Sequence, residues 1–265
     1  MLPRHARAVA LGILIVVTAD LGASAQEVRD IAPTGSLRVA VGVGPAASAF
    51  WATRDPETGK PRGVTVELAK AAAEKLGAPL QLVEYPNSGE IAAAGSKDAW
   101  DISFMPADAE RGEKYVDQGP AYVAYASGYL VRAGSDIDSV ADVDRTGMRV
   151  GCVDGTSTSR TVAKTLKHAT LTKFAKPEAA AELIGSGHLD ALAMGMEALD
   201  DLSKKLPGTR ILPEVIQSTG VVVVVPKGHA AAGDWANHFL EQAKADGTVR
   251  KALDSSGFVG EKVAP

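Results

Sequence analysis

The sequence predicts an α/β protein, because β-type and helical segments alternate along most of the chain. The run "SLRVAVGVG" at 36–44 is rich in valine and ends on glycines, as strands often do. "VTVELAKAAAEKLG" at 64–77 then repeats apolar residues at helical spacing and stops on a glycine. "PLQLVEY" and "WDISFM" are the next two predicted strands. Strands separated by helices in this order predict a mostly parallel sheet covered by helices.

The second half of the chain repeats this alternation. "MRVGCVDG" at 148–155 is a predicted strand, and "TSTSRTVAKTL" at 156–166 follows it as a turn and a helix. "LDALAM" is a further strand, and "TGVVVVVPKGH" at 219–229 is a five-valine strand between a glycine and a proline. The pattern favours two α/β units in one chain.

The first 25 residues have the three-part layout of a secretory signal peptide. Arg4 and Arg7 precede an apolar run at 8–17, and Ala-Ser-Ala stands before Gln26. The run is shorter than the roughly 20 residues that a membrane span requires, so a retained anchor is the weaker alternative. We expect cleavage after Ala25 and export to the periplasm. The remaining chain is long enough for two domains of ordinary size.

Composition excludes several classes of function. The chain has 28 Lys and Arg residues against 32 Asp and Glu residues, with no basic stripe, so nucleic acid is not an expected partner. The single cysteine, Cys152, can form no internal disulfide and lies in an apolar run typical of a buried strand. Because no His/Cys cluster accompanies it, the sequence predicts no metal site and no cofactor.

Seven segments in order resemble a known family. They are "GSLRVAVG", "GKPRGVTVELAKAAAEKLG", "DISFM" followed by arginine six residues later, "GYLV", "GMRVGCVDGTS", "LDALA" and "ADGTVRKAL". Together they look like the periplasmic solute-binding proteins of polar amino-acid ABC importers, family 3. The resemblance implies a type II fold, in which two lobes, each a mostly parallel sheet flanked by helices, close on a solute about a two-strand hinge. It places lobe 1 at 36–126 with 224–265 returning to it, and lobe 2 at 127–223.

Arg111 is the principal candidate for ligand binding. It follows the carboxyl end of a predicted strand, where open α/β sheets bind their ligands. By resemblance to the family, an arginine at this position pairs with the ligand carboxylate, and a guanidinium offers two parallel donors that match a carboxylate. The alternative is a solvated surface charge beside Glu110 and Glu113.

A second candidate is the turn "DGTSTS". Thr156 and Ser157 stand at the predicted start of a helix, where hydroxyls and free N–H groups can hold an anion. The resemblance implies that this turn of lobe 2 grips the carboxylate that Arg111 holds. Simple N-capping is the alternative, and both uses are compatible.

Aromatic and strand residues complete the expected site. Trp51, favoured over Phe50, and Tyr85 lie at strand ends and would form the flat wall of the pocket. Ser103 and Phe104, in the strand before Arg111, are further candidate contacts.

The chain departs from the family where a ligand ammonium would bind. The resemblance implies an acid at the position of Gly195, which is followed by Met196, and both are counted as ligand contacts. An enclosed ammonium without a carboxylate partner is costly, so we expect a carboxylate-bearing solute with an apolar or aromatic body and no α-amino group. Glu197 could replace the acid if the backbone shifts, but an acid at a helix start is more often solvated.

Three classes of function follow from these observations. The first is the binding component of an ABC importer, a monomer that delivers a small carboxylate-bearing solute to an inner-membrane permease. The second is an accessory or sensory protein on the same fold, such as those that accompany methanol dehydrogenases. The third is an enzyme similar to cyclohexadienyl dehydratases, which the sequence disfavours because no acid and base are suitably spaced.

Overall fold

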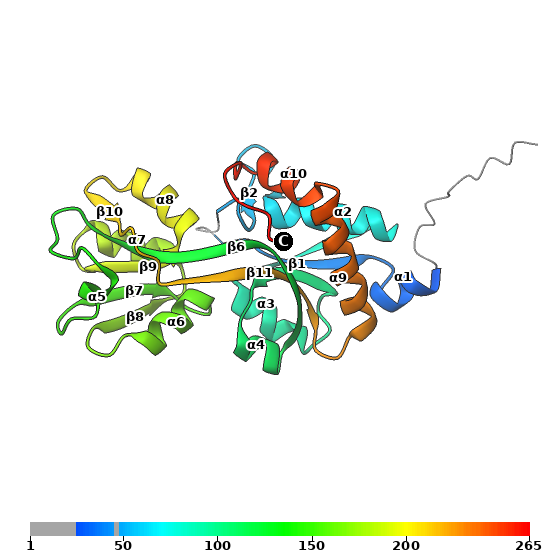
Figure 1. Cartoon of the computed structure of the whole chain (residues 1–265), viewed down its shortest axis with the longest axis horizontal. Coiled ribbons are helices and arrows are strands. Elements are labelled where there is room, and N and C mark those ends of the chain that lie inside the picture. Colours follow the sequence, from blue (N-terminus) through cyan, green and yellow to red (C-terminus); the bar gives the residue numbers. More distant parts are fainter. Residues whose placement is uncertain (1–24, 45–47) are drawn as a thin grey trace, which may run out of the picture.

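The computed structural model describes residues 25–44 and 48–265 and consists of two lobes side by side (Figure 1). The predicted signal peptide and its cleavage site fall almost wholly outside the described residues, and Ala25 already belongs to helix α1 (Ala25–Ile31). Within the described ranges, no helix is long and apolar enough to cross a membrane.

Lobe 1 is built from the elements of the first half of the chain and from its C-terminal end. The predicted strand at 36–44 and helix at 64–77 are confirmed as β1 and α2. The elements of lobe 1 are α1, β1 (Leu37–Gly42), β2 (Thr53–Arg54), β3 (Pro61–Arg62), α2 (Val64–Leu76), β4 (Leu80–Tyr85), α3 (Ser88–Gly95), β5 (Ile102–Pro106), α4 (Ala109–Lys114), α9 (Ala230–Ala245) and α10 (Thr248–Ser255).

Lobe 2 is built from the middle of the chain. The strands predicted from "MRVGCVDG" and "LDALAM" are confirmed as β7 and β9. The elements of lobe 2 are α5 (Val140–Val143), β7 (Arg149–Val153), α6 (Ser157–Thr165), β8 (Thr170–Phe174), α7 (Pro177–Gly185), β9 (Ala191–Gly195), α8 (Met196–Lys205) and β10 (Thr209–Ile211).

Two long strands, β6 (Val116–Arg132) and β11 (Gln217–Pro226), connect the lobes. The nine-stranded sheet has the order β4-β1-β5-β11-β6-β9-β7-β8, with β10 also paired to β6. The outer strands pair in parallel at both ends, β1 with β4 and β5, and β7 with β8 and β9. The ladders of β6 and β11 are antiparallel, because these two strands carry the chain from one lobe to the other and back.

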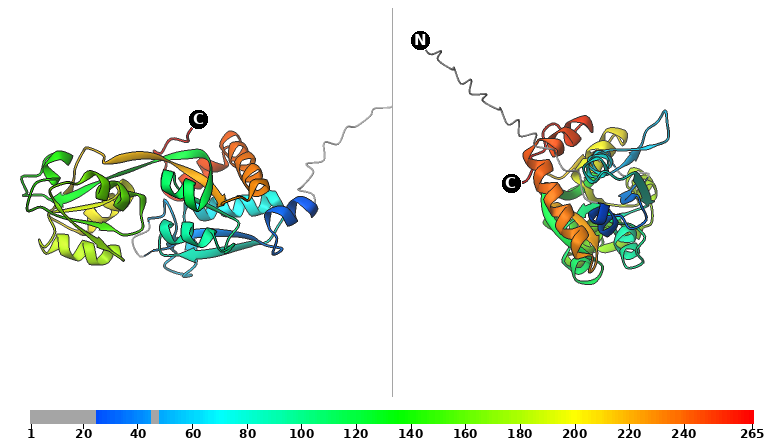
Figure 2. Two further views of the ribbon diagram at one scale, coloured as in Figure 1. Left: turned by 90° about the horizontal axis from the view of Figure 1, so that it is seen from below. Right: turned by 90° about the vertical axis from the view of Figure 1, so that its right-hand side faces the viewer.

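Buried side chains separate into clusters that belong to one lobe or the other. Tyr125 on β6 packs with the core of lobe 1, whereas Tyr129, four residues later, packs with that of lobe 2. Ile216, immediately before β11, packs against the core of lobe 2, and Val221 on β11 packs in that of lobe 1. Each lobe therefore has its own core, as an independently packed unit requires. The views in Figure 2 show α9 and α10 lying on lobe 1 alone.

Candidate functional site

A cavity of about 330 Å³ lies between the two lobes, where strands of both lobes end. From lobe 1 it is lined by residues in or just after the C-terminal halves of β1, β4 and β5, and from lobe 2 by residues in or just after those of β7, β8 and β9, together with the starts of α3, α6 and α8. Carboxyl ends of strands in α/β sheets are the usual place for ligands, because the following loops and helix N-termini converge there. The fold therefore forms its main candidate site at the junction of the lobes.

Five of the nine predicted site residues line this cavity. They are Trp51, Phe104, Thr156, Ser157 and Gly195. They come from both lobes, so the structure brings together segments that are far apart in the sequence. Their role in binding a solute stays a prediction.

The other four predicted residues lie outside the cavity lining. Ser103 is fully buried and its hydroxyl donates to the carbonyl of Ala40 at 2.8 Å. Because side chains alternate along a strand, Phe104 faces the cavity and Ser103 does not. Met196 is partly buried against a core cluster of lobe 2, and Tyr85 packs against a core cluster of lobe 1.

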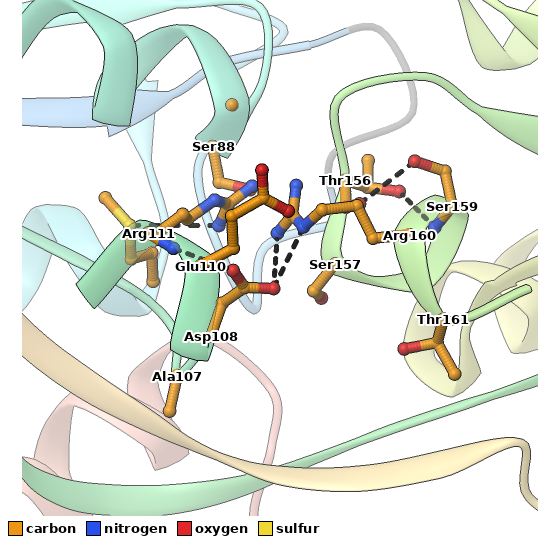
Figure 3. Close-up of polar contacts among 12 residues, drawn as sticks. Ser88, Ala107, Asp108, Glu110, Arg111, Thr156, Ser157, Ser159, Arg160 and Thr161 are labelled. Atoms are coloured by element: carbon orange, nitrogen blue, oxygen red, sulfur yellow. Dashed lines mark hydrogen bonds and ion pairs between the residues drawn. The ribbon is translucent and has the colours of Figure 1, made fainter. Parts of the chain in front are cut away.

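Arg111, the remaining one, is buried beside the cavity (Figure 3). Its side chain is held by α4, whose first turn is capped by Asp108, and the residue is only 3% exposed. Nη2 donates to the hydroxyl of Ser88 and to the carbonyl of Gly155, both at 2.9 Å. Burial lowers the pKa of Arg111 to about 10, and the nearby Arg160 acts in the same direction. Arg111 is therefore not a solvated surface charge.

Neutral groups hold the guanidinium of Arg111 in the described part of the chain. Among the described residues, no Asp or Glu lies in ion-pair contact with it, and Glu110 pairs with Lys114 instead. Its acceptors are neutral oxygens and, more weakly, the sulfur of Met105 at 3.8 Å. Burying a cation with only neutral partners costs free energy, so binding of an anion to it is favourable.

The N-terminus of α6 faces Arg111 from lobe 2. Thr156 is the N-cap, and its hydroxyl accepts from the N–H of Ser159 at 3.0 Å. The preceding Gly155 has a φ of 71°, a left-handed conformation that glycine adopts without strain, and this turn aims its carbonyl at Arg111. The first N–H groups of a helix have no acceptor within the helix, so this end attracts negative charge. N-capping by Thr156 is thus compatible with anion binding at the same turn.

Polar contacts cross from one lobe to the other around the cavity. Besides the bond from Arg111 to Gly155, Nε of Arg160 on α6 donates to Asp108 at 2.9 Å (Figure 3). At another side of the cavity, Nε1 of Trp51 donates to a carboxylate oxygen of Glu197 at 3.1 Å. The lobes are therefore in contact on both sides of the site, as expected for a closed arrangement.

Glu197 is a cavity residue that the sequence analysis named only as a possible replacement for the missing acid. It was expected to be solvated because it starts helix α8, but it is partly buried and lines the cavity. Burial raises the pKa of Glu197 to about 7, against the opposing hydrogen bond from Trp51. The expectation fails because the side chain turns back toward the cavity.

Gly195 makes room for this turn of Glu197. A Cβ atom at position 195 would lie 2.6 Å from one carboxylate oxygen of Glu197, 2.7 Å from the other, and 2.6 Å from the hydroxyl of Tyr125. A side chain at 195 would therefore force the Glu197 carboxylate and the Tyr125 hydroxyl to move. The position of the Glu197 carboxylate therefore depends on the glycine at 195. In the sequence, a glycine at a strand end two residues before an acid was the signal that could have indicated this arrangement.

A two-lobe α/β fold with a cavity between the lobes defines a class of solute-binding proteins. Residues 39–256 match the family described as bacterial extracellular solute-binding proteins, family 3, and the chain belongs to this family. A curated relative is the glutamine-binding protein of Geobacillus stearothermophilus, 27% identical over 176 residues, which are 62% of this chain and 64% of that protein. The match thus spans just under two thirds of that relative's length.

Solved structures share the fold over nearly their whole length. An ancestral arginine-binding protein bound to arginine has a TM-score of 0.75 and 27% identity, with 84% of this chain and 98% of that chain covered. The ancestral amino acid-binding protein AncCDT-1, described as a precursor of cyclohexadienyl dehydratase, has a TM-score of 0.73 and 25% identity, with 86% and 97% covered. The predicted family and the type II two-lobe fold are therefore confirmed.

Proposed function

We propose that the chain is the periplasmic substrate-binding component of an ABC importer and captures a small carboxylate-bearing solute, an amino acid or a related organic acid. The solute binds between lobe 1, at 36–126 and 224–265, and lobe 2, at 127–223. The predicted leader at 1–25 directs export. The protein acts as a monomer and delivers its solute to an inner-membrane permease. The fold and the family support this proposal.

The observation that carries the proposal is that the guanidinium of Arg111 is buried and forms no ion pair with a described Asp or Glu. It points at the N-terminus of α6 across the junction of the lobes, so a ligand carboxylate entering there meets a cation from lobe 1 and helix N–H groups from lobe 2. Such a ligand would replace the carbonyl of Gly155 as an acceptor and would hold both lobes at once. The glutamine and arginine that the relatives are named for both contain a carboxylate.

Closure of the lobes is the expected response to the solute. Addition of a saturating amino-acid ligand should decrease the radius of gyration in small-angle X-ray scattering, because β6 and β11 allow the lobes to rotate together. A ligand shown by calorimetry to saturate the protein without changing the radius would contradict closure. A compound that does not bind serves as the control for solvent effects.

A dehydratase is the second candidate, because Glu197 places an acid with a pKa of about 7 in the cavity. A group with this pKa can donate a proton near neutral pH. Incubation with a hydroxycyclohexadienyl carboxylic acid, which becomes aromatic by losing its ring hydroxyl as water and its ring carboxylate as carbon dioxide, tests this role through the ultraviolet absorbance of the product. We expect no turnover above the uncatalysed rate, and product formation that Glu197→Gln abolishes would favour the enzyme.

An accessory role without import is the remaining alternative from the sequence. No contact in the described part of the chain favours it over import. Co-purification with an ABC permease rather than with a dehydrogenase would support the importer.

A further inference from the structure

We propose that Asp108 and Arg160 form a latch that stabilises the closed arrangement of the two lobes through contacts within the protein. The latch lies next to Arg111 and raises the share of closed molecules before any solute binds. Its consequence for solute affinity rests on the proposed function, whereas the latch itself does not, because all of its atoms belong to the protein.

The ion pair of the latch joins elements of different lobes. Arg160 belongs to α6 of lobe 2, and Asp108 is the N-cap of α4 in lobe 1. Nε of Arg160 donates to Oδ2 of Asp108 at 2.9 Å, and Nη2 lies 2.8 Å from the same oxygen (Figure 3). The other ion pairs found among the described residues each join two residues of the same lobe. In that part of the chain, this pair is therefore the ionic link between the lobes.

The pair is largely shielded from water. The side chain of Arg160 is 21% exposed and that of Asp108 is 15% exposed. Burial acts to raise the pKa of Asp108, but hydrogen bonds from the N–H of Arg111 and from the side chain of Arg160 outweigh it, so this pKa lies below its usual value. Asp108 is thus ionised at neutral pH, and its attraction to Arg160 is screened less than that of a fully exposed pair.

Asp108 is held in place independently of Arg160. Its Oδ1 accepts from the N–H of Arg111 at 3.0 Å and so caps α4. The side chain of Gln118 on β6 fixes the backbone of Asp108, because its oxygen accepts the N–H at 2.9 Å and its nitrogen donates to the carbonyl at 3.0 Å. The carboxylate therefore loses little further freedom when the lobes meet, and more of the attraction remains to favour closure.

The backbones of the two lobes meet beside this pair. A Cβ atom at Gly89, in α3 of lobe 1, would lie 2.5 Å from the carbonyl oxygen of Gly155 in lobe 2 and 3.1 Å from its Cα. The same carbonyl accepts from Arg111 at 2.9 Å and, in a longer bond of 3.5 Å, from Nη1 of Arg160. The lack of a side chain at 89 therefore permits the approach that brings Arg160 to Asp108.

A latch of this kind changes solute affinity through the population of closed molecules. A solute that binds only the closed form has an apparent affinity proportional to the share of molecules already closed. Loss of a hydrogen bond between charged groups changes an equilibrium by roughly tenfold or more. We therefore expect the latch to raise the ratio of closed to open molecules about tenfold, and the solute to close the molecules that remain open.

Small-angle X-ray scattering of the protein without solute measures the effect of the latch. Arg160→Ala and Asp108→Asn should both increase the radius of gyration, because each lowers the ratio of closed to open molecules by about tenfold. Asparagine is a good N-cap whose side-chain oxygen can still accept from the N–H of Arg111, so Asp108→Asn removes the charge and keeps α4. The double variant should add little to either single variant, because both remove the same interaction.

Gly89→Ala tests the latch without changing a charge. Alanine is favourable within a helix, so α3 should still form, but the new Cβ would meet the backbone of Gly155 and hold the lobes apart. The radius of gyration should increase as it does in Arg160→Ala. Arg145→Ala is the matched control, because Arg145 pairs with Asp136 within lobe 2 and its loss should leave the radius unchanged.

Equal radii in wild type, Arg160→Ala and Asp108→Asn would overturn the latch, and so would an equal increase in Arg145→Ala. Circular dichroism should show each variant folded, and Gly89→Ala provides the same comparison if a charge variant does not fold. Because these samples contain no solute, their outcome leaves the proposed function standing. Failure of the wild-type protein to bind L-glutamine, L-arginine or any other carboxylate would overturn the proposed function and leave the latch intact.

Discussion

Arg111→Ala is expected to weaken binding of a carboxylate-bearing solute by about 30-fold or more. Removal of one partner from a buried, hydrogen-bonded charge pair typically costs about 2–5 kcal/mol, and each 1.4 kcal/mol is a factor of ten in affinity. Arg111 is 3% exposed and has no competing carboxylate among the described residues, so a bound carboxylate would be its only anionic partner. Arg111→Lys should restore only part of the affinity, because lysine lacks the bidentate fork.

Calorimetry with the tightest-binding amino acid measures this loss. Arg145→Ala is a suitable control, because Arg145 pairs with Asp136 on the surface of lobe 2, where water and salt screen the pair. Circular dichroism should show both variants folded. Unchanged affinity in Arg111→Ala would mean that the buried guanidinium serves only the contact between lobes.

The sequence predicted the main elements of the fold, and five of its nine candidate site residues line the cavity. Helix starts, strand ends and glycine stops are local signals, so β1, α2 and the turn before α6 could be placed before the structure was known. The cavity residues Trp51, Phe104 and Thr156 were found because they stand directly in or after such segments. Local signals suffice where a residue's position follows from its own element.

The rest of the site depends on contacts between distant segments. The bond from Trp51 to Glu197 joins residues 146 positions apart, and that from Arg111 to Gly155 joins residues 44 apart. No periodicity within α8 shows that Glu197 turns back toward the cavity. The direction in which Ser103 points also follows from the pairing of β5 with β1, which aims its hydroxyl at Ala40. These features require the folded arrangement of the lobes.

Glu197→Gln is expected to stabilise the solute-free protein at pH 8 and to have little effect near pH 5. Folding raises the pKa of Glu197 from 4.5 to about 7, so the folded state binds more protons than the unfolded state between these values. The contribution of Glu197 to the free energy of unfolding is fully present below pH 4.5 and is lost as the pH rises through about 7. The shift corresponds to about 3 kcal/mol, at 1.36 kcal/mol per pKa unit.

Glutamine cannot ionise, so the variant does not share this loss. Chemical denaturation at pH 5 and pH 8 should therefore show a difference in unfolding free energy between variant and wild type that grows with pH. Asp200→Asn should show no such growth, because Asp200 is exposed and paired with Lys204. A constant difference at both pH values would mean that Glu197 is already ionised in the folded protein at pH 5, and that the cavity is polar enough to solvate it. A difference that grows with pH would show that ionised Glu197 destabilises the solute-free folded protein. A cationic group on a ligand would offset this cost on binding.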